Sequence, residues 1–247
     1  MRNLLAAEWA KIWSGRAAWS MALIGLVLGV LAAGGYATGA DAGIANGTTT
    51  IQDVTDQLVR CWLAMLVLSA LLGTVYVSRE YQAGTIGRSV LLSGGRTRLF
   101  GAKLAVGTAM GVAFGLLAAG CAALSPWIFL RGTRHDPVWT RETTLTLVGI
   151  FVVTVLAAPW GALIGWILRK QAAAVAVVLG LSLFVDEALL AAAPAVGKFT
   201  MTIAMSSVYR DGKPELLGAP WAFLVIAGWL TAAGCAAHWL LHRRDVL

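Results

Sequence analysis

The sequence predicts an all-α integral membrane protein: a six-transmembrane-helix bundle with an N-terminal amphipathic interfacial helix and a short cytoplasmic helix. Three observations support this prediction. Of the 247 residues, 59% are hydrophobic and only 13% are charged, whereas soluble domains carry about a quarter charged residues. The apolar residues gather in six long windows, and the Lys and Arg residues lie in short clusters between them. This pattern excludes a soluble domain, a disordered chain and a continuous basic face for nucleic acid, so no nucleic-acid partner is expected.

Residues 1–16 are the predicted interfacial helix. Their apolar side chains recur at helical spacing, at Leu5, Trp9, Ile12 and Trp13. Indole rings prefer the headgroup layer of a membrane, which suits a helix lying in the interface. A plain aromatic and basic start to the first span is an equally good interpretation.

Each apolar window approaches or exceeds the roughly 20 residues that a helix needs to cross a bilayer, except the fifth, which is shorter. The predicted spans, within a single transmembrane domain of residues 1–247, are 17–37, 58–77, 104–130, 145–168, 172–185 and 221–241. The third span is long enough to tilt or to leave the hydrocarbon layer. The fifth is short and runs into two carboxylates, so residues 186–220 are expected to form an outer or re-entrant segment.

The basic residues predict the orientation. Residues 1–16 carry Arg2, Lys11 and Arg16, whereas the next connection, residues 38–57, has no Lys or Arg. Because basic loops stay on the cytoplasmic side, both ends of a six-span chain are expected in the cytoplasm. A cleaved signal peptide over residues 1–40 is the alternative, although its apolar run exceeds the usual length of a signal core.

Small residues predict how the spans pack. Gly107, Gly111 and Gly115 repeat every four residues along the third span. Such stripes let helix backbones approach closely in lipid, where the hydrophobic effect does not drive association. The stripe suits packing within the bundle and equally suits a two-fold interface.

Several kinds of site are missing from the sequence. There is no Gly-x-x-x-x-Gly-Lys-Ser/Thr phosphate loop and no catalytic signature of a hydrolase or metalloprotease. His238 and His242 are four residues apart, but no further ligands accompany them, so no metal site is predicted. Neither a catalytic residue nor a cofactor is therefore expected in this chain, and uphill transport would need an ATPase partner or an ion gradient.

The connection of residues 78–103 is the longest cytoplasmic one. Thr85 is placed to cap a helix of about two turns with an apolar face, and Gly94 and Gly95 are placed to end it. An apolar helix outside the hydrocarbon either folds back on the bundle or docks in a groove of another protein.

At this point the sequence resembles the permease subunits of type-2 ABC transporters, of the bacterial exporter class. The resemblance rests on Glu80, Gly84 and Thr85 after the second span, then on Arg96 and Lys103. In coarse form it covers the whole chain. The family commonly has a proline before the arginine, where this chain has Ser93-Gly94-Gly95.

The resemblance implies a permease of an ATP-driven exporter, such as a multidrug or peptide efflux system, in a bacterial cell membrane. It implies that cytoplasmic P-loop ATPases hold the ATP and Mg, and that a second permease copy or a paralogue completes the path. Its implied coupling residues are Glu80, Gly84, Thr85, Arg88, Arg96 and Lys103. The alternative for the basic members of this set is a simple role as cytoplasmic anchors.

Asp186 and Glu187 are a second candidate site, for the translocation path or an outer gate. Carboxylates at membrane depth are costly and often mark ion or substrate paths. Since they lie some 22 Å along the fifth helix at about 1.5 Å per residue, they are past the middle of the bilayer. An outer-mouth position is the favoured interpretation. If the pair titrates, the chain is instead a proton- or ion-coupled secondary transporter or channel.

Overall fold

The computed structural model describes residues 2–131 and 135–244, and within these ranges it is helical with no strand. Six helical runs are long and apolar enough to cross a membrane, which confirms the predicted fold class. The helices are α1 (Arg2–Ser14), α2 (Arg16–Ala45), α3 (Ile51–Arg60), α4 (Ala64–Gln82), α5 (Ile86–Ser93), α6 (Arg96–Phe129), α7 (Arg141–Leu168), α8 (Gln171–Gly180), α9 (Asp186–Ala192), α10 (Pro194–Gly197), α11 (Met201–Val208) and α12 (Ala219–Arg243). A 3-10 turn, Cys61–Leu63, joins α3 to α4, and a π-helical turn, Leu181–Val185, joins α8 to α9.

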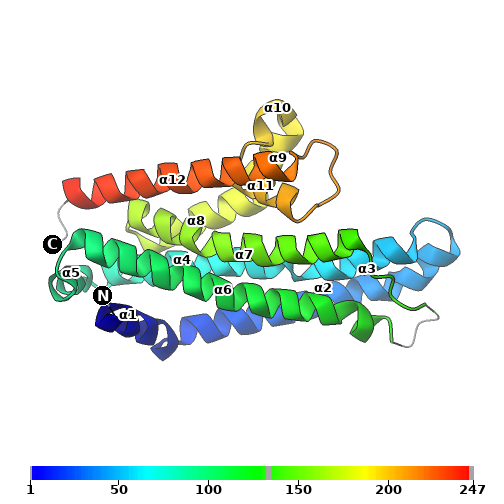
Figure 1. The fold of residues 1–247 in the computed structure, drawn as a ribbon, viewed down its shortest axis with the longest axis horizontal. Helices are drawn as coiled ribbons and strands as arrows, with labels where there is room; N and C mark the ends of the chain where they lie inside the picture. Colours follow the sequence, from blue (N-terminus) through cyan, green and yellow to red (C-terminus); the bar gives the residue numbers. More distant parts are fainter. Residues whose placement is uncertain (1, 132–134, 245–247) are drawn as a thin grey trace.

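The long helices lie roughly along one axis (Figure 1). The N-terminus, α1, α5 and the C-terminal end of α12 gather at one end, called here the α5 end. The connection between α2 and α3 lies at the opposite end. The short helices α9, α10 and α11 project from one side of the bundle, beside the start of α12.

The second apolar run begins earlier than its sequence window indicates. Polar residues at 51–57 suggested a loop, but α3 is amphipathic and buries Val54 and Leu58. Thr50 and Asp53 begin it with a capping box, in which the Thr50 side chain accepts from the Asp53 N–H and the Asp53 carboxylate accepts from the Thr50 N–H. The helix thus continues through the 3-10 turn into α4, as the run Ile51–Gln82.

The fifth run is also longer than its window. The helix does not stop at Val185 but continues through the π-helical turn to Ala192. The polar side chain of Asp186 does not end it, because that side chain is buried against α11 rather than left in lipid. A short helix, α10, follows it directly.

The centre of the bundle is the contact between α4 and α7. A Cβ atom on Gly161 would overlap the carbonyl oxygen of Ala70, and one on Gly73 would overlap that of Ala158. Glycine is therefore required at both crossings. Polar side chains reinforce the contact, since the Ser69 hydroxyl donates to the Thr154 carbonyl oxygen at 2.8 Å. The two backbones pack directly on each other.

The glycine stripe of α6 faces α7. A Cβ atom on Gly111 would lie 2.6 Å from the carbonyl oxygen of Val155, and one on Gly115 would lie 3.0 Å from that of Phe151. Gly107 is looser, with the Ala162 Cβ at 4.0 Å. In this chain the stripe serves packing within the bundle.

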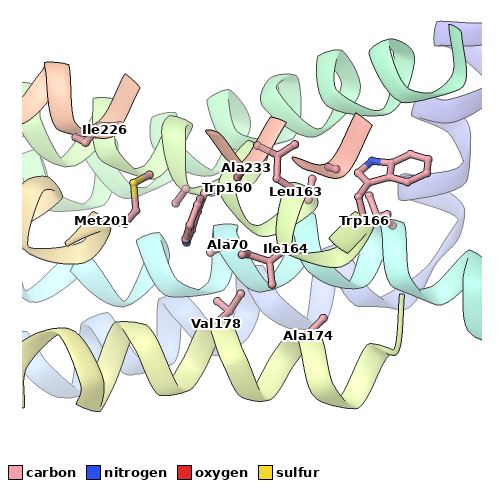
Figure 2. Close-up of a cluster of buried hydrophobic side chains, with 14 of the residues drawn as sticks. Ala70, Trp160, Leu163, Ile164, Trp166, Ala174, Val178, Met201, Ile226 and Ala233 are labelled. Carbon is pink, nitrogen blue, oxygen red and sulfur yellow. The ribbon is translucent and has the colours of Figure 1, made fainter. Parts of the chain in front are cut away.

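The helices α8 and α12 cover the central pair from another side. Figure 2 shows Ala174 and Val178 of α8 directed toward Ile164 of α7 and Ala70 of α4. In contrast, α2 leaves much of its apolar surface open, for example at Leu31. That surface is available to lipid or to a second subunit.

Candidate functional site

The connection between α4 and α6 is built from two glycine-dependent turns around α5. After α4 ends, Gly84 adopts a left-handed conformation with φ of 66°, and its N–H donates to the Tyr81 carbonyl oxygen. Gly94, with φ of 77°, ends α5 in the same way. The Thr85 side chain makes no helix cap; its hydroxyl donates back to the Glu80 carbonyl oxygen at 3.4 Å.

The helix α5 has one buried and one exposed face. Ile86 is buried in the core, whereas the side chains of Leu91 and Leu92 are 82% and 77% exposed. Arg88 is exposed beside them, three and four residues earlier on the same face. Large exposed leucines next to an exposed cation, at the end of the bundle, are typical of a surface that binds a partner.

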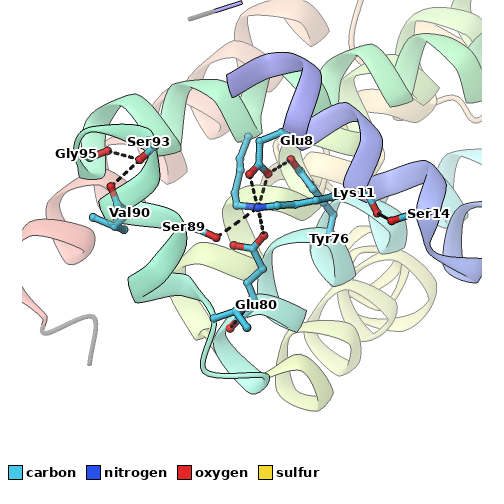
Figure 3. Close-up of polar contacts among 11 residues, drawn as sticks. Glu8, Lys11, Ser14, Tyr76, Glu80, Ser89, Val90, Ser93 and Gly95 are labelled. Carbon is cyan, nitrogen blue, oxygen red and sulfur yellow. Dashed lines mark hydrogen bonds and ion pairs between the residues drawn. The ribbon is translucent and has the colours of Figure 1, made fainter. Parts of the chain in front are cut away.

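A partly buried charge cluster lies beside α5, between it and α1 (Figure 3). We define it as Glu8, Lys11, Tyr76, Glu80 and Lys103. The Lys103 side chain is completely buried, and its Nζ lies 2.8 Å from Glu8 Oε2 and 2.9 Å from Glu80 Oε1. Lys11 Nζ contacts the same two carboxylates, at 2.6 Å and 3.1 Å. Two carboxylates thus balance two ammonium groups.

The cluster joins three helices and contacts a fourth, α5. Glu8 and Lys11 come from α1, Tyr76 and Glu80 from α4, and Lys103 from α6. The Tyr76 hydroxyl donates to Glu8 Oε2 at 2.5 Å, and the Lys103 Nζ lies 4.2 Å from the centre of the Tyr76 ring. Lys11 also donates to the Ser89 hydroxyl of α5 at 3.3 Å. A displacement of α5 or α1 must therefore disturb the same set of contacts.

The contacts of α1 favour the ionised forms of Glu8 and Lys11. Burial by itself would raise the pKa of the Glu8 carboxyl, but the Lys103 ammonium and the donors on Lys103, Lys11 and Tyr76 outweigh it, so the pKa lies below its ordinary value. Burial by itself would lower the pKa of Lys11, but the hydrogen bonds to Glu8 and Glu80 raise it by more. The pKa of Lys11 therefore lies above its ordinary value. Both groups are charged at neutral pH.

A pocket of about 350 Å³ opens beside the cluster. Its wall includes Lys11, Tyr76 and Glu80 together with Arg79 and Thr85. The second Glu80 oxygen, Oε2, is buried and has no hydrogen-bond partner in the described part of the chain. Glu80 is therefore held by only one of its two oxygens.

The other predicted coupling residues have different positions. Arg96 does not join the cluster but donates from Nη1 to the carbonyl oxygens of Leu241 and His242, at 2.9 Å and 3.2 Å. It thus caps the C-terminal end of α12 and ties that end to the start of α6. Gly84 and Thr85 shape the turn through hydrogen bonds to the backbone carbonyl oxygens of Tyr81 and Glu80.

The carboxylates Asp186 and Glu187 separate into two environments. Asp186 is 4% exposed, and its Oδ2 accepts from the Thr202 N–H at 3.0 Å, at the start of α11. Glu187 is more exposed and pairs with Lys213 Nζ at 2.6 Å. Burial by itself would lower the pKa of Lys213, but the hydrogen bonds to Glu187 and Asp211 raise it by more. The pKa of Lys213 therefore lies above its ordinary value. The two neighbouring carboxylates therefore have different partners.

Within the described ranges, no three His, Cys, Asp or Glu side chains lie close enough together to hold a metal ion. His238 and His242 contact each other, with ring centres 4.6 Å apart, and both lie near the Thr97 hydroxyl. The arrangement is that of a packed helix face at the α5 end.

A comparison with family models gives a match over residues 4–185, to the family described as ABC-2 family transporter protein. The match covers well over half of the chain and includes α1, the α4–α6 connection and every residue of the cluster. The chain belongs to the ABC-2 transporter family. A search of curated proteins found no significant match. The resemblance seen in the sequence is therefore confirmed at the level of the family.

Membership makes this ABC-2 protein a multi-pass membrane permease, the transport subunit of its system. Its α4–α6 connection is the segment to which the sequence resemblance assigned coupling. Sequence reasoning placed Glu80 and Lys103 in that segment but missed their partners Glu8, Lys11 and Tyr76. A signal was present, since Glu8 shares a helix face with Leu5 and Ile12, at spacings of three and four. A carboxylate on an apolar face needs a buried cation.

Proposed function

We propose that this permease works in an ATP-driven exporter and is coupled to separate P-loop ATPase subunits through the α4–α6 connection. The observation that supports the proposal is the outward face of α5, where Leu91, Leu92 and Arg88 are exposed at the end of the bundle. Apolar anchors with a flanking charge are the usual content of a helix-in-groove contact. The groove would be on the ATPase, which would hold ATP and Mg.

Within this proposal, the charge cluster has an internal role. Glu80 pairs with Lys11 and Lys103 rather than pointing outward. We therefore assign it the task of fixing α5 to α1 and α6, so that a force on α5 reaches the long helices. Arg88, unlike Glu80, is placed to meet an acidic group of the ATPase.

The proposal also includes the orientation of the permease, its second subunit and its cargo, which follow from the resemblance to this family. The α5 end is cytoplasmic, in agreement with the basic residues of α1, and so are both chain ends. Two such chains, identical or paralogous, enclose the path in a bacterial cell membrane, and the exposed apolar surface of α2 is available for contacts with lipid or the second chain. The cargo is small or amphipathic. An ion-coupled mechanism lacks support, since Asp186 and Glu187 are engaged in separate contacts.

Photo-crosslinking in the source cell tests the contact. Leu91→p-benzoylphenylalanine should capture a P-loop ATPase, identified by mass spectrometry. The matched control is Leu116→p-benzoylphenylalanine, on an exposed apolar position of α6 far from α5. It should capture lipid or a second permease instead. Capture of the ATPase by neither position, or by both equally, would contradict the proposal.

Hydrolysis assays test the coupling. With the assembled complex in vesicles, Glu80→Gln should reduce cargo-stimulated ATP hydrolysis, because it breaks contacts to both lysines. Arg79→Gln is the matched control, as it removes a charge from the neighbouring exposed residue. An unchanged Glu80→Gln complex would reject the coupling role. Transport by vesicles that hold the permease without any ATPase would favour the ion-coupled alternative.

A further inference from the structure

A second pocket lies on the side of the bundle, far from the charge cluster along the chain. Its volume is about 350 Å³, within the range of small-molecule sites. It is lined by Trp160 of α7, Trp229 of α12, Phe199, and residues of the π-helical turn and of α9 to α11. Val196 and Phe199 at its rim are both about half exposed, so the pocket opens to the outside of the chain.

The wall of this pocket is aromatic. Trp160 and Trp229 lie edge to face, with ring centres 6.0 Å apart. The Trp229 indole N–H donates to the Phe199 carbonyl oxygen at 2.8 Å, which fixes the ring against the loop before α11. Aromatic faces that are held in place attract cations as well as apolar groups.

One carboxylate, Asp186, lies in this apolar wall. It is 96% buried, and a charge in such surroundings is costly unless it has a partner. Its Oδ2 accepts from the Thr202 N–H at 3.0 Å, and within residues 2–131 and 135–244 no ion pair neutralises the carboxylate. The nearby lysines are occupied elsewhere: Lys213 pairs with Glu187 and Asp211, and Lys198 lies over the Phe199 ring.

The helix geometry also singles out this place. The π-helical turn Leu181–Val185 ends at Asp186, and both of its terminal residues line the pocket. Single π turns inside α-helices are uncommon and recur at functional sites. Asp186 follows this turn as the first residue of α9, so the turn and the carboxylate lie in the same part of the pocket wall.

We propose that this pocket binds a lipophilic organic cation, with the charge facing the Asp186 carboxylate and the apolar body against Trp160, Trp229 and Phe199. The assignment of that cation as cargo rests on the proposed transport function. The binding itself depends only on the pocket. A neutral lipid chain would fill the apolar volume but would leave the carboxylate without a partner.

Binding of tetraphenylphosphonium to the full chain in nanodiscs tests the proposal, with empty nanodiscs subtracted. Tetraphenylborate, which has the same shape and the opposite charge, is the charge-reversed probe. Asp186→Asn keeps an acceptor for the Thr202 N–H but removes the charge, and it should weaken tetraphenylphosphonium binding by about tenfold or more. Tetraphenylborate binding should not weaken.

Glu187→Gln is the matched control, because it removes the adjacent charge without changing the pocket wall. It should leave tetraphenylphosphonium binding unchanged. Val196→Trp fills the pocket from its exposed rim and should reduce binding while the protein stays folded, as checked by its melting temperature.

Equal binding by wild type and Asp186→Asn would overturn the proposal, and so would an equal loss in Glu187→Gln. If both probes were taken up and no variant changed their uptake, the probes would only be partitioning into lipid. That result would also overturn the proposal. The assay contains no ATPase. Failure of the coupling proposal therefore leaves this result intact, and failure here leaves the coupling proposal standing.

Discussion

The charge cluster at Glu8 and Lys103 gives a prediction about stability that can be worked out from the structure. Lys103 is fully buried and Glu8 is 99% buried, with Nζ and Oε2 at 2.8 Å. Removal of one partner of a buried pair leaves an uncompensated charge, which typically costs about 3–5 kcal/mol. Because Glu80 still neutralises Lys103 in part, we expect Glu8→Gln to cost about 3 kcal/mol, at the lower end of that range. Lys103→Met should cost about the same, since Glu8 keeps Lys11 and Tyr76.

The double variant distinguishes a balanced cluster from independent contacts. Glu8→Gln with Lys103→Met restores neutrality and leaves Lys11 and Glu80 as a pair at 3.1 Å. We expect it to lose about 4 kcal/mol rather than the sum of about 6, which is a coupling of about 2 kcal/mol. The assay is unfolding in mixed micelles titrated with SDS, followed by tryptophan fluorescence. Arg88→Gln, on the exposed face of α5, is the control and should change little.

Two results would refute this reasoning. A double variant that loses the full sum would mean that the charges act independently. A loss below about 1 kcal/mol for Glu8→Gln would mean that α1 does not hold a buried partner of Lys103, as an exposed ion pair gives a loss of that size.

Three further predictions concern other features. Gly161→Ala should destabilise the fold by about 1–3 kcal/mol or more, because its Cβ overlaps the Ala70 carbonyl oxygen, whereas Gly228→Ala, with open space around it, should not; melting temperatures compare the two. Folding lowers the pKa of Glu8, so this carboxylate stabilises the fold fully above the ordinary glutamate pKa, and the stabilisation is lost as the pH falls through the lowered value. Melting temperatures measured at decreasing pH should therefore fall less in Glu8→Gln than in the wild type. Arg96→Gln should release the end of α12, seen as faster amide exchange at its last turn and not in α7.

Much of the fold follows from apolar windows and glycines. The six spans are visible because the hydrocarbon layer sets their length, and α5 is visible because Gly94 ends it with a left-handed turn. The window ends were less predictable. Residues 51–57 look like a loop, yet α3 buries only one face, and polar residues on the other face concealed it. Tertiary contacts decided the boundary there.

The sequence predicted some residues of each candidate site but not the partners that surround them, because those partners are distant in the chain. Glu80 and Lys103 stand out in a polar connection, but Lys11, which pairs with Glu80, and Glu8, which pairs with Lys103, lie 69 and 95 residues earlier in the chain. One sequence does not show which segments meet. Asp186 was noticed as a charge in an apolar run, but the aromatic wall around it is assembled from α7, α12 and the loop before α11. Long-range packing produces both sites.

The backbone contact between α4 and α7 has a mechanical consequence for both sites. With glycine at each crossing, the backbones of α4 and α7 lie in direct contact, which leaves little room for one helix to shift against the other, so we expect the two to move together as one unit. Glu80 belongs to one member of this unit and Trp160 to the other. We therefore expect the aromatic pocket to change size when the π-helical turn, the segment from α9 to α11, or α12 slides against this unit, and a tilt of the unit at one site to reach the other.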